Sequence, residues 1–304
     1  MNKPILAEAC KPGDRVAIVA PAGPFQLKWL HAGCDLLRSW GLEPVYHQDI
    51  CSGWGYLAAE DDKRLQIFVD AFTDPTIKAV ICARGGYGCA RLIEQLPYEI
   101  LKKHPKRFFG FSDITFIHQA LFQKLNWITF HSPMAASQQM LEGTKESQER
   151  LKLALFESSL ETLCPPIPGT PFRGESAQGT LIGGNLSLLL STLGTPWQLN
   201  TDGAILFIED VGEAPYRIDR MFQQMKMAGL FEKLGGLVIG DFGPLQDQYT
   251  TYDAKEFWLN RLDLPASFPV LFDVPAGHIR NNWTLPLGTQ AALDMEKAEL
   301  RIVS

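Results

Sequence analysis

The first residue whose setting suggests chemistry is a serine between an apolar stretch and a helical one. Ser112 follows residues 107–111 (RFFGF) and precedes a helix predicted near residues 114–125. A serine on a sharp strand-to-helix turn projects its hydroxyl outward, and the backbone N–H of the next residue, Asp113, then faces a developing oxyanion. The segment is not a full G-x-S-x-G elbow, because Ile114 replaces the second glycine. A serine that only caps the following helix would have the same local sequence.

A second feature is the glycine-rich segment 84–88 (RGGYG), which follows the apolar run 78–83. Glycines such as Gly85 and Gly86 let the backbone approach a ligand closely. No Lys-Ser or Lys-Thr pair follows them, as it would in a phosphate-binding loop. We therefore interpret Gly85 or Gly86 as a source of a second oxyanion donor, although a simple tight turn would also use these residues.

The third feature is a histidine with carboxylates upstream. His278 lies in a Pro-Ala-Gly-His loop after an apolar strand, a common setting for a catalytic base. Glu209 ends the apolar run 204–208 and would orient such a histidine by accepting its Nδ1–H. Asp210 and Glu213 compete with it for this role. The order Ser, Glu, His is that of α/β-hydrolases.

Alternating strands and helices position these features in the first half of the chain. Apolar runs predict strands over residues 15–20, 42–46, 78–83, 107–111 and 127–130, and helical spacing predicts helices near 25–40, 60–73, 89–96 and 114–125. This alternation indicates an α/β fold with a mostly parallel sheet covered on both faces. Ligands bind outside the carboxyl ends of such strands, where the polar residues described above are found.

The second half repeats the pattern after a break. Residues 164–174 (CPPIPGTPFRG) contain four prolines and are interpreted as a linker. Strands are predicted at 179–182, 204–208, 236–241 and 269–274, and helices near 185–193, 216–229 and 253–262. We therefore predict an N-terminal Rossmann-like domain over 1–163, a linker over 164–176, and a smaller C-terminal β/α domain over 177–304.

Composition excludes several classes of protein. The 304 residues carry a formal net charge of −6 with no cluster of Lys or Arg, which argues against a nucleic-acid partner. No run reaches the roughly 18 apolar residues of a membrane span, and the first residues lack a signal-peptide pattern, so we expect a cytoplasmic protein with no membrane partner. The six cysteines form no C-x-x-C pair, so neither a metal site nor a redox motif is expected.

These features together resemble the LD-carboxypeptidase family of serine peptidases, also called muramoyltetrapeptide carboxypeptidases. The matching segments occur in order along nearly the whole chain. They are residues 15–24 (RVAIVAPAGP), 83–92 (ARGGYGCARL), 110–115 (GFSDIT), 179–194 (GTLIGGNLSLLLSTLG), 206–219 (LFIEDVGEAPYRID) and 277–288 (GHIRNNWTLPLG). One departure is Ser132, which stands where the family has the glycine of His-Gly-Pro.

The resemblance implies a two-domain serine peptidase that needs no cofactor or metal and forms a homodimer. Its substrate would be a murein tetrapeptide, cleaved between the L-centre of a diamino acid and the terminal D-alanine during cytoplasmic peptidoglycan recycling. The implied site comprises the nucleophile Ser112, the acid Glu209, the base His278, and the backbone N–H groups of Gly86 and Asp113 as oxyanion donors.

The sequence offers several alternatives for the residues that recognise the substrate. A cation is expected to bind the free D-Ala carboxylate, and Arg84, Arg217 and Arg280 are the alternatives, with Gly85 as a further substrate contact. A relative that hydrolyses microcin-type peptide–nucleotides would keep the same triad. A non-catalytic two-lobed protein that binds small ligands is the alternative from a different class. A nicotinamide dehydrogenase is disfavoured, because residues 21–24 (PAGP) are not a dinucleotide-binding fingerprint.

Overall fold

The computed structural model describes residues 3–243 and 264–303, and this part of the chain forms two compact units. Unit 1 contains the chain up to Cys164 together with Arg280–Gly288, and unit 2 contains Pro165–Ile279 and the chain from Thr289 onward. The return of Arg280–Gly288 to unit 1 was not anticipated from the sequence. The exact domain boundaries given above stay a prediction.

Unit 1 is built on a six-stranded sheet in the order β12-β5-β4-β3-β1-β2. Its strands are β1 Arg15–Val19, β2 Glu43–Tyr46, β3 Ile77–Cys82, β4 Arg107–Gly110, β5 Thr129–His131 and β12 Leu285–Leu287. Strands β1 to β5 pair in parallel, and β12 runs antiparallel to β5. The predicted Rossmann-like parallel sheet is confirmed. The winding direction reverses between β1 and β3, a topological switch point at which α/β sheets bind ligands.

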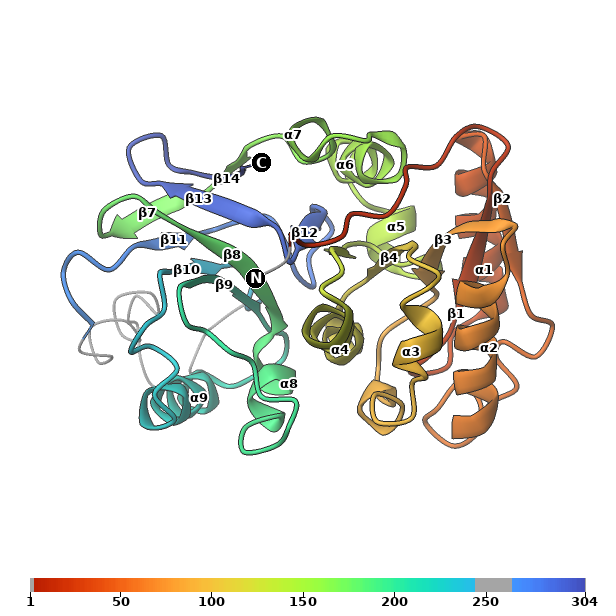
Figure 1. Ribbon diagram of the computed structural model, residues 1–304, viewed down its shortest axis with the longest axis horizontal. Helices are drawn as coiled ribbons and strands as arrows, with labels where there is room; N and C mark the ends of the chain where they lie inside the picture. The colour runs from red at the N-terminus through yellow and green to blue at the C-terminus, as the bar shows by residue number, and fades with distance from the viewer. Residues whose placement is uncertain (1–2, 244–263, 304) are drawn as a thin grey trace. The chain divides into compact units, whose positions relative to one another are not determined.

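The first four helices of unit 1 each connect two consecutive strands, and three more helices follow β5 (Figure 1). They are α1 Leu27–Ser39, α2 Asp61–Thr73, α3 Tyr98–Leu101, α4 Thr115–Leu125, α5 Gln138–Leu141, α6 Lys145–Phe156 and α7 Leu160–Leu163. Phe72 of α2 packs against Phe108 of β4 and stacks on Trp127, so a buried aromatic cluster fixes α2 to the sheet. The helix predicted near 89–96 is wrong, since only the single 3₁₀ turn η1 Cys89–Arg91 forms there.

Unit 2 has an eight-stranded sheet in the order β6-β14-β13-β8-β9-β10-β11-β7. Its strands are β6 Ile167–Pro168, β7 Thr170–Arg173, β8 Ala177–Asn185, β9 Ala204–Glu209, β10 Gly236–Ile239, β11 Val270–Phe272, β13 Gln290–Asp294 and β14 Glu299–Ile302. The central strands β8, β9, β10 and β11 are parallel and the outer pairs are antiparallel. This confirms the predicted β/α architecture of the C-terminal domain.

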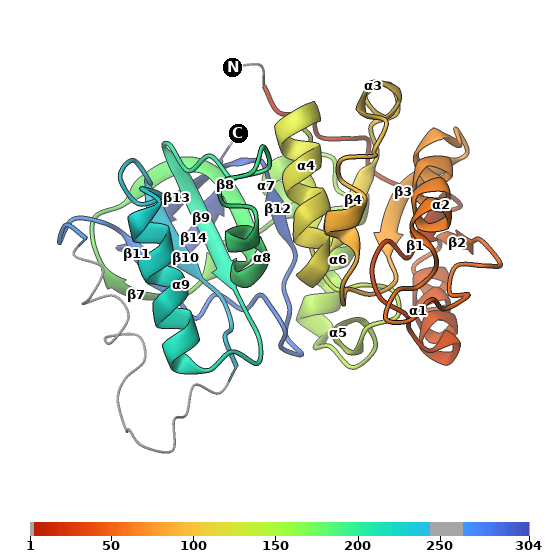
Figure 2. The same ribbon diagram turned by 90° about the horizontal axis from the view of Figure 1, so that it is seen from below.

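Two helices of unit 2, α8 Leu186–Ser191 and α9 Pro215–Met227, lie on the same face of this sheet (Figures 1 and 2). The helix predicted near 253–262 lies outside the described residues. Across the described parts of both units, no helix is both long and apolar enough to cross a membrane.

The proline-rich segment predicted as a linker contains two strands instead. Strands β6 and β7 occupy the two opposite edges of the unit 2 sheet, where each has only one neighbour. Proline has no N–H to donate to a ladder, so within sheets it is found at edges. Pro168 in β6 and Pro171 in β7 are therefore compatible with strands, and a proline-rich composition alone did not reveal this.

Candidate active site

Ser112 occupies a strained turn at the carboxyl end of β4. Its φ is 63°, a left-handed conformation that costs a non-glycine residue on the order of 1–2 kcal/mol. The 3₁₀ turn η2 Ser112–Ile114 begins at this serine, with Phe111 as its N-cap, and Ile114 is the N-cap of α4. Ser112 is thus not the cap of either helix, which favours the interpretation of an exposed hydroxyl on an elbow.

The glycine-rich segment lies directly against this serine. A Cβ on Gly85 would be 2.8 Å from the Ser112 Cβ and 3.0 Å from its Oγ, so only glycine fits there. Gly86 has a φ of 112°, and a Cβ on it would lie 3.2 Å from the Gly23 Cα. The Gly23 N–H donates a hydrogen bond to the Gly85 carbonyl oxygen at 3.0 Å. The structure therefore brings the backbone of the glycine-rich segment to the hydroxyl of Ser112, as the predicted oxyanion site requires.

The Asp113 side chain ties the serine turn to the same segment. Its buried carboxylate accepts a hydrogen bond from the backbone N–H of Cys89 at 2.8 Å. Burial raises the pKa of Asp113, and the hydrogen bond from Cys89 opposes this shift. Asp113 thus has a structural side chain, while its backbone N–H is the group assigned to the predicted oxyanion site.

A buried arginine holds the loops around the serine. Arg64 of α2 is 2% exposed and donates to the carbonyl oxygens of Pro21, Ala59 and Gly88, as well as to the Asp61 carboxylate. These carbonyls belong to the loops that follow β1, β2 and β3. One guanidinium therefore fixes three loops relative to one another, using the donors that arginine presents in a rigid fork.

We expect Arg64→Met to lower the free energy of unfolding by about 3 kcal/mol, because it leaves several buried carbonyls and a carboxylate without this donor. Urea denaturation monitored by circular dichroism would measure the change. Arg91→Met is the matched control, since Arg91 also contacts Asp61 but is exposed. Equal destabilisation by the two substitutions would contradict a special role for Arg64.

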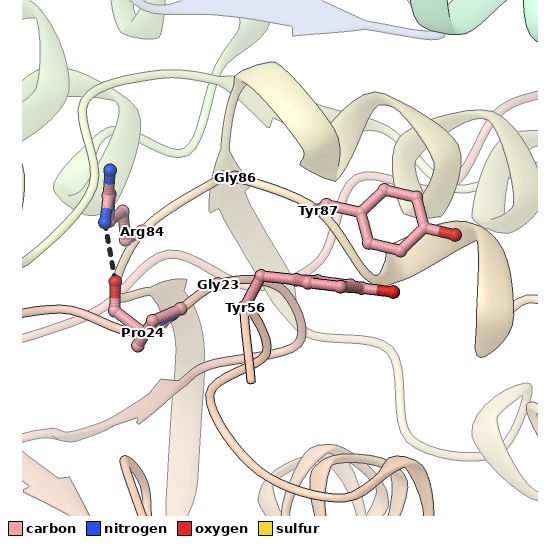
Figure 3. A pocket seen from close by; sticks show the side chains of 6 residues that line it. All are labelled: Gly23, Pro24, Tyr56, Arg84, Gly86 and Tyr87. Carbon is pink, nitrogen blue, oxygen red and sulfur yellow. Dashed lines mark hydrogen bonds between the residues drawn. The ribbon is translucent and has the colours of Figure 1, made fainter. Parts of the chain in front are cut away.

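A pocket of about 610 Å³ opens at the topological switch point of unit 1. It is lined by Gly23, Pro24, Tyr56, Arg84, Gly86 and Tyr87, and we call it the Arg84 pocket. Figure 3 shows the Arg84 guanidinium directed to the Pro24 carbonyl oxygen, at 2.7 Å, while the two tyrosine rings lie on the other side of Gly23 and Gly86. The rings are in edge-to-face contact with centroids 5.5 Å apart. The pocket thus combines a cation, aromatic surface and the glycine predicted as an oxyanion donor.

In unit 2, His278 and Glu209 form a close hydrogen bond. His278 Nδ1 lies 2.7 Å from Glu209 Oε2, and the Glu209 carboxylate is fully buried at the end of β9. Gly277, with a φ of 129°, makes this contact possible, because a Cβ there would lie 3.0 Å from the same oxygen. The pair has the arrangement expected of a base and its orienting acid.

Charge around His278 favours its protonated form. Burial lowers the pKa of His278, but the hydrogen bond and charge of Glu209, together with Asp210 and Asp241, outweigh burial and raise the pKa above the usual 6.5. Burial raises the pKa of Glu209, and His278 opposes that shift. An imidazolium formed during a reaction would therefore be stabilised at this position.

The competing carboxylates of unit 2 have other partners. Asp210 accepts from the backbone N–H groups of Ser187 at 2.9 Å and Val211 at 2.8 Å, so it fixes the start of α8. Glu213 lies 3.4 Å from Arg217. Of the three carboxylates considered from the sequence, Glu209 is the one that contacts His278 through a hydrogen bond.

The remaining predicted cations and one further histidine have structural contacts. Arg217 pairs with Glu213, and Arg280, in unit 1, pairs with Glu142 at 2.8 Å. His118 is buried, with its Nε2 2.8 Å from the Gly110 carbonyl oxygen, and burial lowers its pKa to about 4. It supports the turn before Ser112 from inside the fold and was not predicted to be catalytic.

Comparison with known proteins matches both units. The N-terminal domain of LD-carboxypeptidases matches residues 16–132, and the C-terminal domain of LD-carboxypeptidases matches residues 178–293. The chain belongs to the LD-carboxypeptidase family. The resemblance inferred from the sequence is thereby confirmed at the level of the family, which is a family of peptidases.

Relatives with known names agree with this placement. The chain is 36% identical to a probable murein peptide carboxypeptidase of Bacillus subtilis, over 94% of this chain and 91% of that protein. It is also similar to the crystal structure of a muramoyltetrapeptide carboxypeptidase from Oxalobacter formigenes, with 32% identity, a TM-score of 0.83, and coverage of 95% and 97% of the two chains. The structure of MccF in complex with glutamyl sulfamoyl guanosine has a TM-score of 0.90 at 21% identity over 99% of each chain, which shows a shared fold.

Some residues around Ser112 were missed from the sequence. Arg64 looks like an ordinary charged residue of an amphipathic helix, and only its spacing from Asp61 hinted at an ion pair. Tyr56 and Tyr87 carried no signal, since isolated tyrosines in loops are common. Ser132 stands where the family has a glycine. The backbone at this position does not require glycine, because its φ is not positive.

Proposed function

We propose that the chain is a serine-type carboxypeptidase that releases the terminal D-alanine of a murein tetrapeptide in the cytoplasm, as a step of peptidoglycan recycling. The observation that carries the proposal is the 2.7 Å hydrogen bond from His278 Nδ1 to the buried Glu209. With Nδ1 committed to the carboxylate, Nε2 is the nitrogen that would accept a proton from a serine. The strained Ser112 beside Gly85 and Gly86 supports its assignment as that serine.

The proposed reaction is acyl transfer to water. His278 takes the Ser112 proton as Oγ bonds to the carbonyl carbon, and the backbone N–H groups of Gly86 and Asp113 stabilise the resulting oxyanion. The C–N bond then breaks as His278 gives its proton to the leaving amine of D-alanine. A water molecule, deprotonated by His278, hydrolyses the acyl-enzyme and restores Ser112.

The direct test is to incubate the full chain with murein tetrapeptide and to measure the D-alanine released. A tetrapeptide that ends in L-alanine is the matched control, and it should be cleaved far more slowly. If the chain released no D-alanine but hydrolysed an aminoacyl-sulfamoyl or peptidyl-nucleotide compound, the proposed substrate would be wrong and the microcin-type alternative would replace it.

We further propose Arg84 as the cation that binds the D-alanine carboxylate. Arg217 and Arg280 form ion pairs with Glu213 and Glu142, whereas Arg84 donates to a neutral carbonyl oxygen and lines the same pocket as Gly86. Its charge is therefore available to a substrate anion next to the proposed oxyanion site.

Arg84→Gln is accordingly expected to raise KM for the tetrapeptide about 10- to 100-fold with a small effect on kcat, the size of one lost hydrogen bond to a charged group. Steady-state kinetics of D-alanine release would measure it. A tetrapeptide amidated at its C-terminus should show no such difference between the wild-type chain and the variant. Arg280→Gln serves as the control. If KM increased in Arg280→Gln and not in Arg84→Gln, Arg280 would be the residue that binds the D-alanine carboxylate.

A further inference from the structure

A short hairpin after β2 contributes residues to both the Arg84 pocket and a second pocket. Within residues 53–58, Trp54 and Leu57 exchange backbone hydrogen bonds of 3.0 Å, and Gly53 donates to the Ala58 carbonyl oxygen at 2.8 Å. The Ala58 N–H is anchored on the Ala22 carbonyl oxygen at 2.9 Å, and Leu57 and Ala58 are buried. The hairpin is thus fixed at its base.

Two large aromatic side chains project from this fixed base. Trp54 is 52% exposed and Tyr56 is 68% exposed. Tyr56 lines the Arg84 pocket, as Figure 3 shows, and Trp54 lines the other pocket. An indole held half in solvent on a fixed hairpin provides apolar surface for a ligand with little loss of conformational entropy on binding.

The second pocket, which we call the Trp54 pocket, has a volume of about 350 Å³. It is lined by Asp49, Ser52, Gly53, Trp54, Glu60 and Lys63. Lys63 Nζ lies 3.0 Å from the Asp49 carboxylate, so these two side chains hold each other in place. The pocket therefore combines one aromatic face with two carboxylate acceptors, a serine hydroxyl and an ammonium donor. Because it has two carboxylates and one cation, its formal charge is negative.

We infer that the Trp54 pocket binds a neutral pyranose ring, namely the amino sugar carried by a glycosylated peptide substrate. The C–H face of a pyranose is apolar and matches an indole ring, while its hydroxyl and acetamido groups need the acceptors and donors that the pocket supplies. An anionic group such as the phosphate of a nucleotide would meet two carboxylates against one ammonium, which is unfavourable. The inference rests on the proposed function and adds to it a binding site for the sugar of the substrate.

One hairpin contributes to both pockets, because Tyr56 lines the Arg84 pocket and Trp54, two residues earlier, lines the Trp54 pocket. We therefore place the sugar of the substrate at the hairpin whose other aromatic residue lines the pocket of Gly86.

The test compares N-acetylmuramoyl-tetrapeptide with the free tetrapeptide. We expect kcat/KM to be about tenfold higher for the glycosylated peptide, equivalent to about 1.4 kcal/mol. Trp54→Ala should reduce this ratio to about one while leaving kcat/KM for the free peptide unchanged. Glu60→Gln, a milder surface change, should reduce the ratio about threefold. Trp40→Ala, which alters a separate pocket of unit 1, should keep the ratio of the wild-type chain.

Binding to the Ser112→Ala chain separates this inference from the proposed function. Calorimetric titration should give an approximately tenfold lower Kd for the glycosylated peptide, and the difference should disappear in the Ser112→Ala, Trp54→Ala double variant. Equal Kd values for the two peptides, or a preference that survives both Trp54→Ala and Glu60→Gln, would overturn the inference. A wild-type chain that binds the sugar through Trp54 but releases no D-alanine would refute the proposed function alone.

Discussion

Ser112→Ala should lower kcat for D-alanine release by about 10⁶-fold, because loss of a triad nucleophile removes the covalent route and leaves only binding and oxyanion stabilisation. The expectation rests on the left-handed φ of Ser112 and on its contact with Gly85, which together present the hydroxyl beside the proposed oxyanion donors. The measurement is the rate of D-alanine release by the variant, with enough enzyme to detect a residual rate. A variant with near-normal kcat would show that another group attacks the peptide.

Ser112→Gly provides the matched control for folding. Glycine adopts a φ of 63° without the penalty that Ser or Ala incurs, so this variant should be about 1 kcal/mol more stable than Ser112→Ala. Both variants should be equally inactive. Inactivity accompanied by unchanged or higher stability assigns the loss to chemistry, whereas strong destabilisation of both variants in urea would indicate a structural serine instead.

Glu209→Gln should lower kcat by about 10⁴-fold, since an amide at this position holds the histidine in the wrong tautomer and leaves its cation without a counter-charge. The same change should move the acid limb of the pH profile. Glu209 raises the pKa of His278 above 6.5, so the kcat/KM of the wild-type chain should rise with pH through a midpoint above this value. When the charge of Glu209 is removed, burial dominates the pKa of His278, and the midpoint of the profile should fall below 6.5.

Asp210→Asn is the control for this second prediction. Asp210 also carries charge near His278, but its carboxylate is bound by the backbone N–H groups of Ser187 and Val211. We expect a loss of stability, a much smaller decrease of kcat, and a smaller displacement of the acid limb. If Asp210→Asn matched Glu209→Gln in both kcat and pH midpoint, the assignment of Glu209 as the orienting acid would be wrong.

Much of the fold was predictable because its central strands are short apolar runs bounded by turn residues. Strands β1, β3 and β9 are examples, and each is buried almost throughout. The errors have physical causes. The segment after β3 has helical spacing, but the chain makes only one 3₁₀ turn there, and Pro97 at its end disfavours helical backbone in the residue before it. Strand β12 pairs with β5, far away in the sequence, and no local pattern reports such a pairing.

The site was predictable only in part, for a similar reason. Glu209 is the last residue of β9 and Asp210 follows it, and nothing in their local sequence states which one contacts His278. That choice depends on Gly277, whose missing Cβ leaves room for the Glu209 carboxylate. Arg64 is harder still to predict, because a buried arginine is recognised by the carbonyls around it rather than by its neighbours in the helix. The catalytic roles of Ser112, Glu209 and His278 stay a prediction until the substitutions are made.

The prolines at both edges of the unit 2 sheet have a consequence for how copies of the chain meet. An exposed edge strand with a full row of N–H groups is a template onto which another chain can add a strand, and this is a common start of aggregation. Pro168 in β6 and Pro171 in β7 each remove one such donor from an outermost strand. Intermolecular extension of this sheet is thereby discouraged at both ends. The predicted homodimer should accordingly form through side chains rather than through a continuous intermolecular sheet.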